Sequence, residues 1–288
     1  MMKAWVTGAG GLIGNYLVQV APQFAPGWTV RGLTRDQLDL SDFAAVARAF
    51  HADSPALVIH CAALSKSPAC QANPALARRL NVEATECLAE LAAEIPLIFL
   101  STDLVFDGRK GNYTEADAPN PLSVYAATKL AAEAVVLRNP RHAVVRTSLN
   151  GGVSPTGDRG FNEEMCRAWR AGQILNLFTD EFRSPLPAEV TARAVWELAA
   201  QSVSGIFHVA GSARMSRWEI GQCLAARCPE LQPQVRAGSL KNYPGAPRAP
   251  DTTLDCTQAQ RQLSFALPGL AGWLAAQPAS AWRSGKET

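Results

Sequence analysis

The sequence predicts a doubly wound α/β fold, a parallel sheet of the Rossmann type, together with a smaller C-terminal substrate-binding domain. Three observations support this prediction. A glycine-rich turn over residues 8–14 joins two apolar segments near the start of the chain. Apolar strand patterns then alternate with helical patterns up to residue 148. Two of these strands end in small or hydroxyl-bearing residues, which fits the carboxyl edge where open α/β sheets bind ligands.

The composition is that of an ordinary enzyme. The chain has 288 residues, 48% of them hydrophobic and 18% charged, with a net charge of +2. This balance argues against a nucleic-acid partner, and the apolar runs are too short for a membrane span. Seven cysteines without a C-x-x-C pair and four scattered histidines give no reason to expect disulfides or a metal site. Together with an N-terminus that has no signal-peptide pattern, they predict a cytoplasmic protein.

The glycine turn has the pattern Thr7-Gly8-x-x-Gly11-x-x-Gly14. Such a turn points backbone N–H groups and the positive end of a helix dipole at one place, where a pyrophosphate fits. Gly8, Gly11 and Gly14 are therefore candidate residues for binding a dinucleotide. The alternative is a glycine-rich turn in some other α/β protein.

The second strand is expected over residues 28–33. In NAD-specific proteins an acidic residue often ends this strand and binds the ribose 2′-hydroxyl. This chain instead has Arg31, followed closely by Arg35. Arginine forks suit a 2′-phosphate, so we expect NADP(H), with NAD(H) as the second option. The alternative is that both are solvated loop arginines. Ser41 is expected to cap a helix that continues to Phe50.

The third strand is expected over residues 56–63, a continuous apolar run that ends in Cys61-Ala62-Ala63. A strand buried on both faces has this pattern, and the small residues at its end leave room for a cofactor. A long helix is expected over 74–94. It contains Asn81, a poor helix former, which is either a surface residue or one that faces the site.

The fourth strand, over 95–102, ends in two hydroxyl-bearing residues, and a loop over 107–121 is long enough to be functional. The helix that follows, from Ser123, places Tyr125 and Lys129 four residues apart on one face. This pair is a candidate for carbonyl chemistry. Its alternative is a surface tyrosine and lysine on an amphipathic helix.

The rest of the chain has a different character. One more strand is expected over 143–148. Beyond it we expect helices over 161–171, 188–201, 215–228 and 268–276, a strand over 205–209, and loops over 150–160, 178–185 and 233–251. The segment 186–210 is expected to return to the main sheet. We therefore assign residues 1–148 and about 186–210 to the cofactor domain, and the remainder of 149–288 to the substrate-binding region.

With these motifs in place, the chain resembles the extended short-chain dehydrogenase/reductases, and among them the dTDP-4-dehydrorhamnose reductase family. The resemblance covers about residues 2–275. It rests on the glycine motif, on Ser101-Thr102-Asp103-Leu104-Val105-Phe106-Asp107-Gly108, and on Val124-Tyr125-x-x-Thr128-Lys129. It implies an NAD(P)H-dependent oxidoreductase that reduces a keto group on a nucleotide sugar.

The resemblance also implies residue roles. Tyr125 would donate a proton to the carbonyl oxygen, and Thr102 would polarise that carbonyl. Lys129 would lower the pKa of the phenol and bind the nicotinamide ribose. Arg31 or Arg35 would hold the 2′-phosphate, and Asp103 would be structural. The cofactor groove would be lined by residues from the glycine turn and from later strand ends and helices: Gly8, Gly11, Leu12, Ile13, Gly14, Asp39, Ala62, Ala63 and Asn81.

Several positions depart from the family pattern. His60 stands where the family commonly has asparagine, Leu149 replaces an aromatic residue, and Arg183 stands at a glycine. The substrate pocket is therefore expected to be remodelled. Two other functions stay open, a cofactor-binding regulatory subunit like that of methionine adenosyltransferase, and a nucleotide-sugar epimerase. Dehydration is disfavoured because Leu104, not glutamate, follows Asp103. A homodimer is left open.

Overall fold

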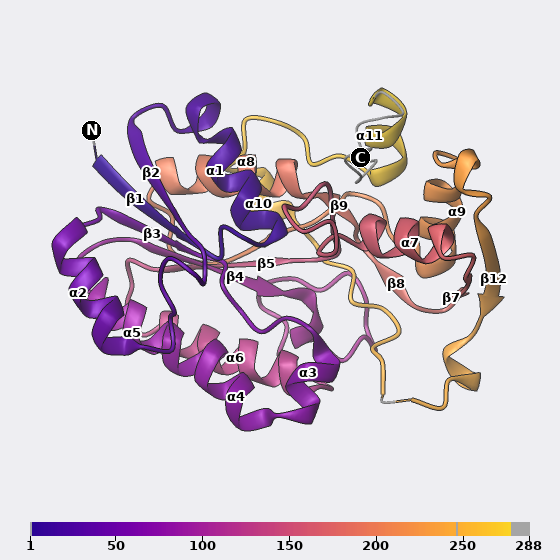
Figure 1. The fold of residues 1–288 in the computed structure, drawn as a ribbon, viewed down its shortest axis with the longest axis horizontal. Helices are drawn as coiled ribbons and strands as arrows, with labels where there is room; N and C mark the ends of the chain where they lie inside the picture. Colours follow the sequence, from indigo (N-terminus) through magenta and orange to yellow (C-terminus); the bar gives the residue numbers. More distant parts are fainter. Residues whose placement is uncertain (1, 246, 278–288) are drawn as a thin grey trace.

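A central six-stranded sheet organises the computed structural model, which describes residues 2–245 and 247–277. Its strands lie in the order β10-β5-β4-β3-β1-β2, and every neighbouring pair is parallel (Figure 1). The predicted doubly wound sheet is confirmed. Its strands are β1 Met2–Thr7, β2 Trp28–Leu33, β3 Leu57–His60, β4 Leu97–Thr102, β5 Ala143–Thr147 and β10 Gly205–Val209.

Helices cover both faces of this sheet, as the continuous apolar strands require. β3, β4 and β5 are buried along their whole length, so both of their faces need a partner. One face packs against α1 Leu12–Phe24 and α8 Ala188–Ala200. The other packs against α2 Phe43–Asp53, α5 Ala84–Leu91 and α6 Val124–Val136 (Figure 1).

A second, smaller core lies beyond the carboxyl edge of the sheet. It contains Phe161, Trp169, Leu177 and Ile220, all buried. We call the elements around it the smaller lobe: α7 Phe161–Arg170, β7 Ile174–Phe178, α9 Arg217–Ala225, β12 Gln234–Gly238 and α11 Leu270–Ala276. This separate core supports the predicted domain division, whose exact boundaries stay a prediction. Residues 278–288, the end of the predicted substrate-binding region, lie outside the described part of the chain.

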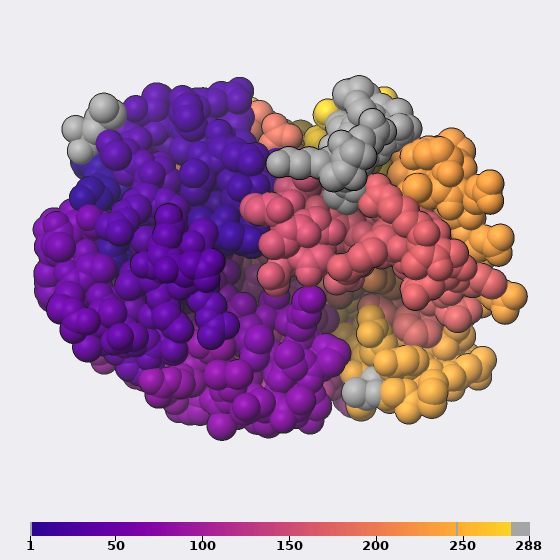
Figure 2. All heavy atoms as spheres, viewed as in Figure 1, coloured from indigo at the N-terminus to yellow at the C-terminus, as the bar shows by residue number. Residues whose placement is uncertain are grey.

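Short elements connect these parts. Three short helices complete the fold: α3 Ser67–Ala72, α4 Pro74–Arg78 and α10 Thr257–Gln260. Four two-residue strands form two small sheets, β8 Phe182–Arg183 with β11 Met215–Ser216, and β6 Asn150–Gly151 with β9 Leu186–Pro187. Figure 2 shows the N-terminal half and the segment after residue 150 side by side on one face. There the Tyr16 hydroxyl accepts a hydrogen bond from the Val153 amide at 3.1 Å.

Three sequence-based expectations about elements are wrong. Asp42, not Ser41, caps α2, because its carboxylate accepts the Ala45 amide while Ser41 binds Asp39 instead. The expected loop 233–251 contains β12, which pairs with β7. The expected loop 178–185 contains β8. Such short strands depend on partners far away in the sequence, so local patterns do not reveal them.

After β9 the chain passes through α8 and β10 along the main sheet. α8 packs beside α1, where the Trp196 indole donates a hydrogen bond to the Leu17 carbonyl at 2.9 Å. β10 then joins the edge of the sheet beside β5. Within the described residues, we find no helix whose length and apolar character would suffice to cross a membrane.

Candidate active site

The glycine turn lies at the carboxyl end of β1. Gly8 adopts a φ of +71°, and a Cβ there would come within 2.7 Å of the Ala62 amide nitrogen. A Cβ on Gly14 would lie 2.3 Å from the Gly8 carbonyl oxygen. Only glycine lets the turn, the first helix and the end of β3 approach so closely. The predicted residues Gly8, Gly14 and Ala62 are therefore brought together.

The first turn of α1 is open toward this place. Gly11 occupies the N-cap position, and no side chain caps the helix. The first amides of the helix thus offer donors, with the positive end of its dipole, to an anion. Leu12 is buried and Ile13 half-buried beside the sheet. These residues can therefore hold the pyrophosphate of a dinucleotide at the open end of α1.

The two predicted arginines differ in position. Arg31 lies inside β2, and its guanidinium is paired with Asp53, at the end of α2. Arg35 follows the carboxyl end of β2, and its side chain is 78% exposed. Its Nε lies 3.8 Å from Asp39, which in turn accepts hydrogen bonds from Ser41. Arg35 is the better placed of the two for a 2′-phosphate, because it follows the carboxyl end of β2 and is largely exposed, whereas Arg31 lies inside the strand in a close ion pair with Asp53.

Asn81 interrupts the long predicted helix in a specific way. Residues Arg79–Glu83 form a π-helical turn between α4 and α5, a distortion common at functional sites. Asn81 is buried there, and its amide accepts from the Leu64 amide at 2.7 Å and donates to the Leu64 carbonyl at 3.1 Å. It also donates to the Thr128 hydroxyl at 3.0 Å. Asn81 therefore fastens the segment after Ala63 to the Tyr125 helix.

The predicted catalytic residues come from β4 and α6. Thr102 is the last residue of β4, and its hydroxyl accepts the Leu104 amide at 3.2 Å. Tyr125 lies in the first turn of α6, which Ser123 caps. Lys129 is buried one turn later, where its Nζ donates to the Leu100 carbonyl at 2.6 Å and lies over the Phe99 ring. The structure thus gathers the three residues at the carboxyl edge of the sheet.

Burial dominates the electrostatics of this group. It raises the pKa of the Tyr125 phenol, and the nearby Asp103 carboxylate raises it further. A hydrogen bond with Thr102 and the charge of Arg183 act in the opposite direction. Burial also lowers the pKa of Lys129 to about 7. The expected effect of Lys129 on the pKa of Tyr125 stays a prediction, and in this structure the Lys129 Nζ is directed at Leu100 and Phe99.

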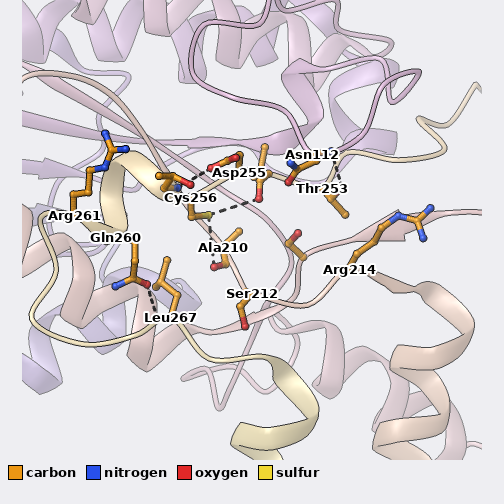
Figure 3. A pocket seen from close by; sticks show the side chains of 14 residues that line it. Asn112, Ala210, Ser212, Arg214, Thr253, Asp255, Cys256, Gln260, Arg261 and Leu267 are labelled. Atoms are coloured by element: carbon orange, nitrogen blue, oxygen red, sulfur yellow. Dashed lines mark hydrogen bonds between the residues drawn. The ribbon is translucent and has the colours of Figure 1, made fainter.

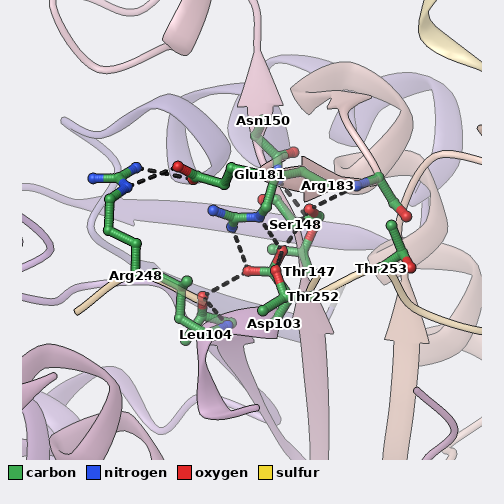
Figure 4. A network of polar contacts seen from close by, with 12 residues as sticks. Asp103, Leu104, Thr147, Ser148, Asn150, Glu181, Arg183, Arg248, Thr252 and Thr253 are labelled. Atoms are coloured by element: carbon green, nitrogen blue, oxygen red, sulfur yellow. Dashed lines mark hydrogen bonds and ion pairs between the residues drawn. The ribbon is translucent and has the colours of Figure 1, made fainter. Parts of the chain in front are cut away.

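A buried network that the sequence did not reveal surrounds Asp103 (Figure 4). Arg183 forms a two-point ion pair with this carboxylate, and Ser148 and Thr252 donate to it as well. Nearby, Arg248 binds Glu181 in the same two-point manner, at 2.7 and 2.9 Å. The only hint of this network in the sequence was Arg183 at a position where the family has glycine. Asp103 and Arg183 are 80 residues apart, so no local pattern contains both.

Comparison with known proteins decides the family. The family model described as the RmlD substrate binding domain matches residues 2–276. The chain belongs to this family.

The relatives of this chain, which is a member of the RmlD family, have different names. It is 32% identical to "Probable low-salt glycan biosynthesis reductase Agl14" of Haloferax volcanii, over 97% of this chain and 98% of the relative. It is 31% identical to a dTDP-4-dehydrorhamnose reductase of Sinorhizobium fredii, over 93% of both chains. It is 30% identical to methionine adenosyltransferase 2 subunit beta of Mus musculus, over 90% of this chain and 81% of the relative.

Solved structures show the same fold. A dTDP-4-dehydrorhamnose reductase of Bacillus anthracis in complex with NADP superposes with a TM-score of 0.85 at 22% identity, over 96% of this chain and 98% of that chain. MoeE5 in complex with UDP-glucuronic acid and NAD superposes with a TM-score of 0.77 at 25% identity, over 96% and 97%.

His60, which departs from the RmlD family pattern, lies below the site. It is fully buried at the end of β3, between the Thr7 hydroxyl at 2.7 Å and the Thr85 hydroxyl at 3.0 Å. Burial lowers its pKa to about 3, and the charge of Lys129 adds to this effect. The ring is therefore neutral at physiological pH and links three elements of the cofactor half.

A hollow of about 590 Å³ opens elsewhere, between the end of β10 and residues 253–261 (Figure 3). Arg214, Asp255, Cys256 and Arg261 are among its lining residues. None of the predicted site residues lines it, so we assign it no part in the reaction. Among the described residues, no group of three or more His, Cys, Asp or Glu side chains is arranged to hold a metal ion.

Proposed function

We propose that this protein reduces a keto group on a nucleotide sugar, with NADPH as the hydride donor. The observation that carries the proposal is the placement of Thr102, Tyr125 and Lys129 at the same sheet edge as the open first turn of α1. Catalysis and dinucleotide binding need this combination. The membership in the RmlD family and the two relatives named reductases support it.

The chemistry follows from these side chains. When bound, the nicotinamide supplies a hydride to the carbonyl carbon. Tyr125, whose phenol is held protonated by burial, donates the proton that the new alkoxide needs. Thr102 donates a hydrogen bond to the carbonyl oxygen and stabilises the charge that develops there. Lys129 lies one helical turn from Tyr125 and would bind the ribose of the nicotinamide.

The glycine turn and Arg35 define the cofactor. Gly8, Gly11 and Gly14 provide the pyrophosphate cradle, with Leu12, Ile13, Asp39, Ala62 and Ala63 around the groove. Arg35 favours NADP(H) over NAD(H). A fluorescence titration with both reduced cofactors tests this preference, and equal dissociation constants would contradict it.

Turnover tests the reaction itself. NADPH oxidation is measured with a panel of dTDP- and UDP-linked 4-keto sugars that includes dTDP-4-dehydrorhamnose. We expect at least one member to be reduced. If NADPH binds and no member of the panel is reduced, the reductase proposal fails.

The relatives named methionine adenosyltransferase 2 subunit beta favour a second candidate, a cofactor-binding regulatory subunit. In that case Tyr125 and Lys129 serve only as cofactor contacts. Hydride transfer to any keto sugar excludes a purely regulatory role. An epimerase would interconvert nucleotide sugars without net NADPH oxidation, and the same panel separates it.

We further propose that the protein works in the cytoplasm, where its seven cysteines would stay reduced. We also propose that two copies of the chain form a homodimer. Light scattering of the purified protein measures its mass, and a monomeric mass would contradict the dimer.

A further inference from the structure

A buried ion pair joins the catalytic strand end to a segment 80 residues away. The Arg183 Nε donates to Asp103 Oδ2 at 2.7 Å, and its Nη2 donates to Oδ1 at 2.5 Å (Figure 4). Asp103 is fully buried and the Arg183 side chain is 8% exposed. This is the planar two-point geometry that only arginine offers to a carboxylate.

Two hydroxyls complete the surroundings of the carboxylate. Ser148, just after β5, donates to Oδ2 at 2.6 Å, and Thr252 donates to the same oxygen at 3.2 Å. Asp103 is thus held by three segments that are distant in the sequence. Its position is fixed by tertiary structure and not by its own short turn.

The position of Asp103 matters because it follows Thr102 directly. The Thr102 hydroxyl donates to Asp103 Oδ1 at 3.2 Å, longer than the contact of the same oxygen with Arg183. Arg183 therefore makes the shorter, charge-assisted hydrogen bond to this oxygen. The Thr102 proton is left weakly held, so it can turn toward the oxygen of a bound ketone.

The same pair acts on the phenol. The charge of Asp103 raises the pKa of Tyr125, and the charge of Arg183 lowers it. The arginine thus offsets part of the field that its partner exerts on the proton donor. Both effects require the two side chains to lie close to Tyr125.

Arg183 reaches this place from the smaller-lobe side of the molecule. It belongs to β8, whose antiparallel partner β11 leads directly into α9. The neighbouring Phe182 amide also donates to the Pro250 carbonyl at 2.7 Å. Through β8 and its partner β11, the ion pair therefore connects the catalytic strand end to the smaller lobe.

We propose that Arg183 is a positioning residue: it clamps Asp103, frees the Thr102 hydroxyl for the substrate carbonyl, and makes the catalytic centre depend on the docked smaller lobe. The inference rests on the proposed reductase function for its activity readout. Arg183 acts through Asp103 and Thr102, because its Nε and Nη2 groups both donate to the Asp103 carboxylate.

The main test compares Arg183→Met with wild type. Methionine keeps an unbranched apolar stem but removes the guanidinium fork, so Asp103 draws the Thr102 proton to itself. With dTDP-4-dehydrorhamnose and NADPH, we expect kcat to fall about tenfold or more, while KM and the NADPH dissociation constant stay within about twofold. Arg183→Lys should recover little, because an ammonium supplies one point charge.

Two further variants keep the test decisive. Asp103→Asn combined with Arg183→Met removes the unpaired charge, and we expect it to regain about threefold or more of the kcat lost by Arg183→Met alone. Ser148→Ala removes one hydroxyl from the carboxylate and should give a smaller loss in a protein that still folds. Arg214→Met is the matched control, since it removes an Arg–Asp pair with Asp251 at the surface, and its kcat should match wild type.

A readout without substrate separates this inference from the proposed function. Hydrogen–deuterium exchange of the NADPH-bound protein should become faster over residues 102–106 in Arg183→Met and not in Arg214→Met. If wild type reduces no sugar of the panel but the exchange changes, the reductase proposal fails and the clamp of Arg183 on Asp103 stands. A kcat equal to wild type, a loss confined to KM, or no recovery in the double variant would overturn the positioning role.

Discussion

Tyr125 illustrates how burial adapts a side chain to its role. A phenol in water already holds its proton at neutral pH, and here burial and the charge of Asp103 hold it more strongly. A proton donor for ketone reduction must be protonated at rest, so these effects suit the acid role. A bound cofactor and substrate then have to make proton release favourable, and the charge of Arg183 contributes because it lowers the pKa of the phenol.

The first prediction concerns this phenol. Tyr125→Phe removes the proton donor and leaves the glycine turn intact. We expect turnover of the keto sugar to fall by about 10²-fold or more, with the NADPH dissociation constant nearly unchanged. Stopped-flow NADPH oxidation and fluorescence titration measure the two quantities. Tyr243→Phe, an exposed tyrosine, serves as control, and equal activity of the two variants would contradict the role of Tyr125.

The second prediction concerns pH and His60. Its lowered pKa means that the unfolded state binds a proton between about pH 6.5 and pH 3 while the folded state does not. The free energy of unfolding therefore falls as the pH drops through this window. From pH 7 to pH 5 the loss due to His60 is about 2 kcal/mol.

His60→Asn should remove that part of the pH dependence, because asparagine hydrogen-bonds without titrating. Urea unfolding at pH 7 and pH 5 measures the difference. Part of the loss of unfolding free energy at pH 5 persists in His60→Asn, since burial also lowers the pKa of His208 to about 4. The exposed His51 provides the control substitution His51→Asn. An unchanged difference in His60→Asn would contradict the assignment.

At the scale of elements, the glycine turn and the π-helical turn lie on two sides of the proposed cofactor site. The glycine turn allows α1 to start against the end of β3, and the π-helical turn directs Asn81 inward. Both are local distortions of regular structure, and both bring backbone segments into contact that a regular helix would keep apart.

The third prediction tests the first of these elements. Gly14→Ala places a Cβ 2.3 Å from the Gly8 carbonyl oxygen, so the turn must open. We expect unfolding to become easier by about 1–3 kcal/mol and NADPH affinity to fall about tenfold or more. Gly27→Ala is the control, because nothing lies within 4 Å of a Cβ there. Wild-type NADPH affinity in Gly14→Ala would show that the turn tolerates movement.

The fourth prediction tests the π-helical turn. Asn81→Ala leaves both backbone groups of Leu64 without their partner, which costs about 2 kcal/mol of folding stability. The segment after Ala63 should loosen and NADPH should bind more weakly. Asn73→Ala, at the exposed start of α4, removes a cap that is worth about 1 kcal/mol and should leave NADPH affinity unchanged. Equal affinities in the two variants would argue against a role for Asn81 in the site.

At the scale of the whole molecule, the cofactor half is not a contiguous piece of chain. Leu186, Val195 and Trp196 belong to the same core as Val6 and Ile59 of the first strands. β10 covers the edge of β5. After β5 the chain leaves the sheet, forms part of the smaller lobe and then returns as α8 and β10. The core of the sheet is therefore complete only when residues from both sides of this excursion are present.

The fifth prediction follows from this connectivity. A chain that ends at residue 150 lacks α8 and β10, so one face of its sheet and the edge of β5 are exposed. We expect it to lack a cooperative thermal transition, whereas the full chain unfolds cooperatively. Circular dichroism during heating measures this. A sharp transition in the shortened chain would show that the first five strands suffice.

The sequence alone determined much of the fold and of the cofactor half. The glycine spacing, the buried strands 97–102 and 143–147, and the Tyr125–Lys129 helix are local patterns, and residues that act through the backbone near them can be recognised from a few neighbours. The alternation of strands and helices also predicted a parallel sheet, whereas the strand order was decided by the tertiary structure.

Only the tertiary structure decided the rest. It paired Arg31 with Asp53, turned Lys129 toward Leu100, placed Asn81 in a π-helical turn and joined Arg183 to Asp103. Each of these depends on groups brought together from separate segments, and a buried charge or amide takes whichever partner the packing supplies. Sequence spacing carries no record of such partners, which is why the local motifs could be predicted and these long-range contacts could not.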